Sequence, residues 1–150
     1  MPDCLETTID KFTFRVATDR NYSPDGVWMH DLGGGRIRVG VTDFVQQHSG
    51  DVAFATVKAP GTTIAVGDEF AELETVKANV GLPLPFAGAI VRVNPSLEAT
   101  PEVVNQDPYG AGWLAEVLAT SWQEALRGQL DPPAYLAVMQ SQVDQELRRP

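Results

Sequence analysis

Apolar and polar residues alternate with a period of two through most of the first 118 residues, in runs separated by glycine and proline. This alternation predicts short, half-buried β-strands, because successive side chains of a strand point to opposite faces of the sheet. The expected strands cover residues 12–16, 27–30, 36–41, 52–57, 62–66, 71–74, 88–94 and 113–118. About eight short strands separated by turns indicate a small β-sandwich or a flattened barrel.

One helix is expected to interrupt the strands. Asp43, with Gln46 three residues later, has the spacing of an N-cap and its partner, and Gly50 ends the segment after barely two turns. His48 lies in the last turn, where a partial positive charge suits the helix dipole. A short helical connection is therefore predicted here.

The pattern changes to a helical period after residue 120. Ser121 and Glu124 form a capping box for one helix, which Gly128 ends, and Asp131 caps a second helix. The second helix carries its apolar residues along one side, and we expect them to pack against the sheet rather than a partner helix: Leu136, Met139, Val143 and Leu147.

These segments define the expected organisation of the chain. Residues 1–20 form a partly ordered leader, residues 21–120 a mainly β domain with short helices, and residues 121–150 a C-terminal helical segment packed on that domain. At 150 residues, with 43% hydrophobic content, the chain is long enough for one domain with a real core.

One hairpin organises the chain. Ala71 and Leu73 alternate with Glu72 and Glu74, and a tight turn with Lys77 at its tip leads into the start of another strand. A lysine at a hairpin tip is ordinarily only a solvated charge. A rigid hairpin also presents a mobile amine clear of the body, which an enzyme that acylates lysine requires.

Charge and cysteine content narrow the possible functions. The net charge of −9 and the pI of about 4.5 oppose nucleic-acid binding. No run of about 18 apolar residues is long enough to span a membrane. The single cysteine, Cys4, cannot form an internal disulfide, and we expect a cytoplasmic protein. Cys4, His30 and His48 lack the local spacing of metal ligands, so no metal is expected.

The hairpin resembles the lysine hairpin of lipoyl-carrier domains through Glu74, Thr75, Val76, Lys77 and Ala78. Residues 22–118 further resemble the glycine cleavage H-protein family, in Tyr22-Ser23-Pro24, Trp28, Gly40-Val41-Thr42-Asp43, Gln47-His48, Asp107-Pro108-Tyr109 and Gly112-Trp113-Leu114. The resemblance implies a barrel-sandwich hybrid fold, lipoic acid in amide linkage to Lys77, and a carrier rather than an enzyme. Biotin carriers usually have methionine on both sides of the lysine, where this chain has Val76 and Ala78.

Two departures from the family pattern concern the cargo, the chemical group that the lipoyl arm would carry. Gly26-Val27 precedes the tryptophan where the family has histidine-glutamate, and Gly81 stands where it has aspartate. In the family those acidic residues help to hold a cationic aminomethyl group, which neither valine nor glycine can pair with. The leader with its cysteine is similar to that of the lipoate-binding proteins of bacterial sulfur oxidation.

The main interpretation is therefore a lipoate-binding protein of sulfur-compound oxidation, linked to a heterodisulfide-reductase-like complex. The alternative is a glycine cleavage H protein that works with the glycine cleavage enzymes. Either role implies a lipoate-attachment enzyme and dihydrolipoamide dehydrogenase as partners, with no nucleic acid or membrane. An unmodified scaffold protein and a cysteine enzyme using Cys4 are the remaining alternatives.

Overall fold

The computed structural model describes residues 2–147 of the chain. Its strands are β1 (Cys4–Ile9), β2 (Phe12–Ala17), β3 (Asn21–Tyr22), β4 (Val27–Asp31), β5 (Arg36–Val41), β6 (Val52–Val57), β7 (Thr63–Ile64), β8 (Glu69–Thr75), β9 (Asn79–Pro83), β10 (Gly88–Val93) and β11 (Ala115–Ala119). Its helices are α1 (Asp43–Ser49), α2 (Ser96–Ala99), α3 (Val103–Gln106), α4 (Trp122–Ala125) and α5 (Pro132–Leu147).

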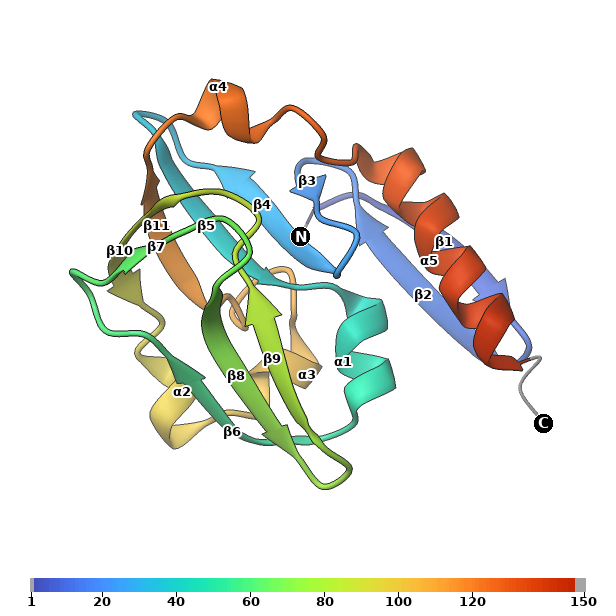
Figure 1. Ribbon diagram of the computed structural model, residues 1–150. Helices are drawn as coiled ribbons and strands as arrows, with labels where there is room; N and C mark the ends of the chain where they lie inside the picture. The colour runs from blue at the N-terminus through green and yellow to red at the C-terminus, as the bar shows by residue number, and fades with distance from the viewer. Residues whose placement is uncertain (1, 148–150) are drawn as a thin grey trace.

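The strands form two main antiparallel sheets. One has the order β3-β4-β5-β11-β10-β7 and the other the order β6-β8-β9. Figure 1 shows the three-stranded sheet in front of the larger one, and buried residues of both sheets belong to one hydrophobic core. The expected fold class, mainly β with short helices and a C-terminal helix, is confirmed, and the sheets remain open.

The core follows from the alternation in the sequence. Ala71 and Leu73 of β8 are buried, whereas Glu74 on the opposite face is exposed. Trp28 of β4 is fully buried, and its indole lies against Gly40, where any side chain would collide with it. Because β8 buries Ala71 and Leu73 on one face, its other face remains available for polar side chains.

The N-terminal residues differ from the prediction of a partly ordered leader with one short strand. They form a complete hairpin, in which β1 pairs with β2 from Cys4 opposite Ala17 to Ile9 opposite Phe12. Figure 1 shows this hairpin standing beside α1 and α5. Apolar positions in β1 are few, so its order depends on pairing with β2 and on contact with α5, and neither is visible in local sequence.

The cap of α1 also differs from the prediction. Thr42, not Asp43, is the N-cap, since its Oγ1 accepts a hydrogen bond of 3.3 Å from the amide of Val45. Asp43 instead accepts hydrogen bonds from the backbone of Arg15 at 3.0 Å and from the side-chain amide of Gln46 at 2.7 Å. The aspartate therefore joins α1 to the N-terminal hairpin.

The helix α5 packs against β1 and β2 of the N-terminal hairpin and against β3, the edge strand of the six-stranded sheet. Asp131 caps it as expected, accepting a hydrogen bond of 2.9 Å from the amide of Ala134. Its buried face is Tyr135, Met139 and Val143, whereas Leu147 is exposed. Within residues 2–147, no helix is long and apolar enough to cross a membrane.

The helix α4 is shorter than expected. Ser121 accepts a long hydrogen bond of 3.5 Å from the amide of Glu124, but the helix ends at Ala125 instead of continuing to Gly128. The preceding strand β11 begins at Ala115, two residues later than predicted.

Candidate functional site

Lys77 lies at the tip of the β8–β9 hairpin, which extends beyond the body of the molecule (Figure 1, bottom). Its neighbour Val76 is 92% exposed, and Lys77 and Ala78 are exposed as well. An exposed amine on a supported turn can enter the active site of another enzyme. The predicted attachment residue is therefore accessible.

Thr75 holds the shape of the turn. Its backbone amide donates to the carbonyl of Ala78 at 2.9 Å. Its hydroxyl lies 3.1 Å from both the amide and the carbonyl of the same residue, accepting from the first and donating to the second. Three contacts between one pair of residues fix the backbone on both sides of Lys77, while the lysine side chain itself stays outside the network.

The outward face of the hairpin is acidic. Glu74 is exposed and lies opposite Asn79 in the strand register, while Glu72 is half-buried opposite Gly81. Glu69 is exposed near the base of the hairpin. The predicted site residues Glu74, Thr75, Val76 and Ala78 therefore divide into an acidic flank and the turn itself.

A cavity of about 450 Å³ lies beside the hairpin, between β9 and α1. Phe44, Val45, His48 and Ser49 of α1 line one side of it, and residues 79–83 line the other. Asp25 also borders this cavity and supplies a carboxylate. The cavity thus combines an apolar wall with one acidic group.

Val27 and Gly81 stand where the family has acidic residues, and the structure shows what surrounds each of them. Val27 is fully buried in the core and does not line the cavity, so its side chain says nothing about the cargo. At Gly81 the carboxylate of Glu69 occupies the space where a side chain would begin. Acidic groups are therefore present: Glu69 belongs to the same hairpin as Lys77, and Asp25, which the sequence did not indicate, lies far from Lys77 along the chain.

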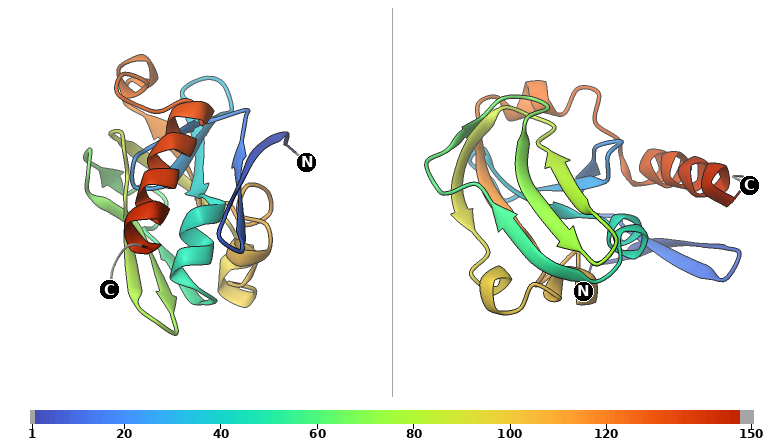
Figure 2. Two further views of the ribbon diagram at one scale, coloured as in Figure 1. Left: turned by 90° about the vertical axis from the view of Figure 1, so that its right-hand side faces the viewer. Right: turned by 60° about the horizontal axis from the view of Figure 1, so that its bottom comes forward.

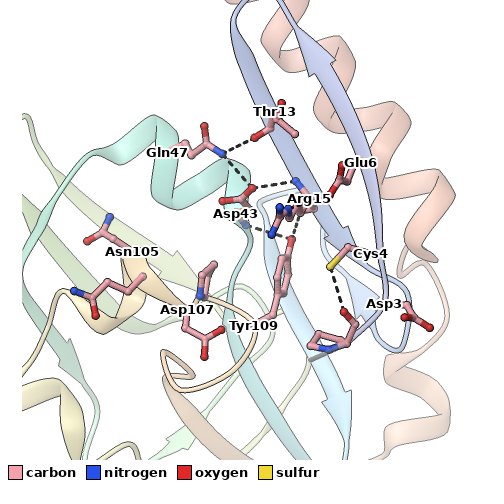
Figure 3. Close-up of a pocket in the computed structure, with 13 residues that line it drawn as sticks. Asp3, Cys4, Glu6, Thr13, Arg15, Asp43, Gln47, Asn105, Asp107 and Tyr109 are labelled. Atoms are coloured by element: carbon pink, nitrogen blue, oxygen red, sulfur yellow. Dashed lines mark hydrogen bonds and ion pairs between the residues drawn. The ribbon is translucent and has the colours of Figure 1, made fainter.

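Another cavity, of about 580 Å³, is on a different part of the surface, between the N-terminal hairpin and the loop that follows α3. Figure 3 shows its hydrogen bonds, in which the hydroxyl of Tyr109 donates to the carbonyl of Arg15 at 2.6 Å and accepts from the amide of Asp43 at 3.2 Å. Cys4 borders the cavity, and burial raises the pKa of its thiol despite the nearby charge of Arg15. A raised pKa disfavours the thiolate that a cysteine enzyme needs.

The histidines lie apart in the structure. His30 is 3.7 Å from Asp19, and burial lowers the pKa of its imidazole. His48 is 3.2 Å from Glu146 and stacks on Phe44. Among residues 2–147 no group of three His, Cys, Asp or Glu side chains is placed to hold a metal ion.

The structure presents an exposed lysine at the tip of a hairpin on two open sheets, an arrangement suited to a carrier domain that is modified on lysine. The family whose profile matches residues 20–142 is described as "Glycine cleavage H-protein". The glycine cleavage system H protein of Mycolicibacterium smegmatis is 40% identical over 126 residues, which are 83% of this chain and 96% of the relative. That of Mycobacterium tuberculosis is 37% identical over 125 residues, covering 80% and 93%.

A solved structure agrees with these matches. The crystal structure of a glycine cleavage system H protein from Mycobacterium marinum superposes with a TM-score of 0.73 at 31% identity, covering 81% of this chain and 97% of the other. The chain belongs to the glycine cleavage H-protein family.

Membership in this family tests several predictions made from the sequence. Proteins of this family are carriers rather than catalysts, and they hold lipoate covalently on a lysine, so the prediction of a lipoyl carrier is confirmed. The interpretation as a sulfur-oxidation protein with a heterodisulfide-reductase-like partner finds no support in these relatives. The alternative interpretation, a glycine cleavage carrier, fits them better.

Proposed function

We propose that Lys77 is the lipoylated residue and that the chain serves glycine cleavage. In this role it carries the aminomethyl group from glycine decarboxylase to the tetrahydrofolate-dependent aminomethyltransferase. A lipoate-attachment enzyme modifies Lys77, dihydrolipoamide dehydrogenase restores the oxidised cofactor, and all act in the cytoplasm. The observation that carries the proposal is the exposed position of Lys77 on a turn that Thr75 fixes.

Attachment fits the residues that surround Lys77. The turn leaves the amine free. Asn79, two residues after Lys77 in the sequence, already lines the cavity between β9 and α1. When bound, the lipoyl group supplies a disulfide that can be opened to accept a small group through sulfur. The protein contributes position, mobility and shelter from water.

The cavity suits a cationic cargo. Asp25 offers a carboxylate that can pair with an ammonium group, and a charge-assisted hydrogen bond of this kind is worth roughly 1.5–3 kcal/mol. Val45 and Phe44 form an apolar wall that excludes water from one side. The sulfur-oxidation interpretation depends mainly on a lack of acidic residues at the matching positions, and Asp25 supplies such a residue to the cavity.

Mass spectrometry and reconstitution test the proposal together. Protein treated with a lipoate-attachment enzyme should gain one lipoyl group, and peptide mapping should place it on Lys77. Lys77→Arg should abolish the modification, whereas Lys58→Arg should leave it unchanged. The modified protein should then support glycine decarboxylation with the purified glycine cleavage enzymes. Modification of Lys58 or Lys11 instead, or a lipoylated protein that supports no turnover, would refute the proposal.

A further inference from the structure

A second, apolar pocket lies beside Lys77, on the other side of α1 from the cavity that contains Asp25. It measures about 260 Å³, and the N-terminal hairpin, α1 and α5 enclose it. Figure 2 (left) shows these three elements side by side, with the β8–β9 turn extending beyond them. The side chains that matter most are Phe12, Phe14, Phe44, Val143, Leu147 and Lys77 itself.

The walls of the pocket are firmly packed. Phe14 and Phe44 meet edge to face with ring centroids 5.7 Å apart, and both are buried. His48 stacks on Phe44 with centroids 5.6 Å apart, and its Nδ1 lies 3.2 Å from Glu146 of α5. This contact joins α1 to α5 and closes one side of the pocket.

The rim of the pocket remains open to water. Phe12 is 54% exposed and Leu147 is 52% exposed, although both are large apolar residues. They lie on different elements, yet they converge on one pocket that Lys77 also borders. Apolar side chains that gather around a hollow are a common mark of a binding site.

The pocket is built largely from residues outside the part of the chain that matches the family. That match covers residues 20–142, whereas Phe12, Phe14, Val143 and Leu147 fall on either side of it. The pocket is therefore an addition of this chain to the matched region.

The side chain of Lys77 can reach both the apolar pocket and the cavity with Asp25. Its methylene groups lie over Gly50, at the C-terminal end of α1. Phe44 and His48 line both the apolar pocket and the cavity with Asp25, so these two side chains form the wall between them. A flexible group on Lys77 can turn to either side of that wall.

We propose that the apolar pocket is a resting site for the unloaded lipoyl group on Lys77. The proposal rests on the proposed function, in which Lys77 is the lipoylated residue. The unloaded group is an uncharged hydrocarbon chain with a dithiolane ring, and the aromatic and aliphatic walls remove it from water. The carboxylate on the lining of this pocket, Glu146, lies 3.2 Å from Nδ1 of His48, whereas Asp25 borders the other cavity, where we place the cationic cargo.

The test measures how well the pocket shields the dithiolane. Protein lipoylated on Lys77, as verified by peptide mapping, is treated with a neutral water-soluble phosphine, and mass spectrometry follows reduction of the ring. Phe12→Ser and Leu147→Ser should each accelerate reduction by roughly three- to tenfold, because a docked group reacts only through its undocked fraction. Phe54→Ser is the matched control, since Phe54 is 64% exposed and lies outside the pocket.

A second readout does not depend on reactivity. The methyl resonances of Val143 and Leu147 should shift when Lys77 is lipoylated, and those of Val66, which lies outside the pocket, should not. Equal reduction rates in the wild type and both pocket variants would overturn the proposed resting site, and so would methyl resonances of Val143 that do not move. Either result would leave the proposed function intact. A Lys77 that accepts no lipoyl group would overturn both.

Discussion

The carboxylate of Glu69 covers Gly81, in the space where a side chain at position 81 would begin. Introducing an acidic residue with Gly81→Asp therefore forces two like charges together on neighbouring strands. We expect Gly81→Asp to lower the free energy of unfolding by about 1 kcal/mol, and Glu69→Gln in the same chain to restore most of it. Denaturant titration of the four proteins in this cycle measures the coupling, and strictly additive effects would contradict it.

Val27 shows why a residue matched by sequence position need not face the cargo. Its side chain is fully buried, so Val27→Glu places a carboxylate in the core without a partner. We expect a loss of about 3 kcal/mol or more in the free energy of unfolding. Val66→Glu is the control, because Val66 is 67% exposed. Equal effects of the two variants in urea denaturation would show that Val27 is not a core residue.

Asp25 should retain the cationic cargo. Asp25→Asn removes the charge from the cavity but keeps its shape, so we expect the aminomethyl group to be lost to water roughly tenfold faster. Release of formaldehyde from loaded protein measures this rate. Asp51→Asn changes an exposed aspartate outside the cavity and should leave retention unchanged. An Asp25→Asn protein that keeps its cargo as long as the wild type would exclude this role.

Thr75 should matter for attachment as well as for stability. Thr75→Val removes the hydroxyl that contacts Ala78, and we expect a cost of about 0.5–1.5 kcal/mol in unfolding free energy. The kcat/KM of the attachment enzyme should also fall, and Thr75→Ser should rescue it. Thr62→Val removes a comparable turn hydroxyl, which donates to Ala59 at 2.6 Å, so it tests whether stability alone lowers kcat/KM.

Glu116 gives the protein a pH-dependent stability. Burial raises the pKa of this carboxyl, but hydrogen bonds from Arg38 and Arg36, each 2.7 Å from it, outweigh burial and leave the pKa below its ordinary value. A lowered pKa in the folded state means that the stabilisation is complete above the unfolded pKa of about 4.3 and is lost as the pH falls through the folded pKa.

The matching variant is Glu116→Gln. We expect it to lose roughly 1.5 kcal/mol of stability at pH 7, at the lower end for charged hydrogen bonds because the arginines are partly exposed. The difference from the wild type should shrink below about pH 4, as thermal unfolding across pH will show. Glu102→Gln, at an exposed site, should change stability by less than about 0.5 kcal/mol. A difference that stays constant with pH would mean that charge is not the cause.

The attachment hairpin could be predicted because its determinants are local. The alternation of Ala71 and Leu73 with glutamates fixes which face of β8 is buried, and the turn residues place Lys77 at the tip. The fold class followed in the same way from short alternating runs and turns. The buried face of α5 could not be predicted in this way, because Tyr135 is buried by stacking on Tyr22, which is more than a hundred residues away in the sequence.

Local sequence by itself determined most of the strands, the attachment hairpin and the exposed lysine, since each depends on side chains only a few residues apart. The tertiary structure alone decided which carboxylates lie near that lysine and which apolar residues surround it. Asp25 reaches the cavity because β9 packs beside α1, and Glu69 covers Gly81 through the register of β8 and β9. Phe12 and Leu147 border one pocket because α5 packs against β1 and β2. Such contacts depend on the closure of the whole chain, which no short window of sequence contains.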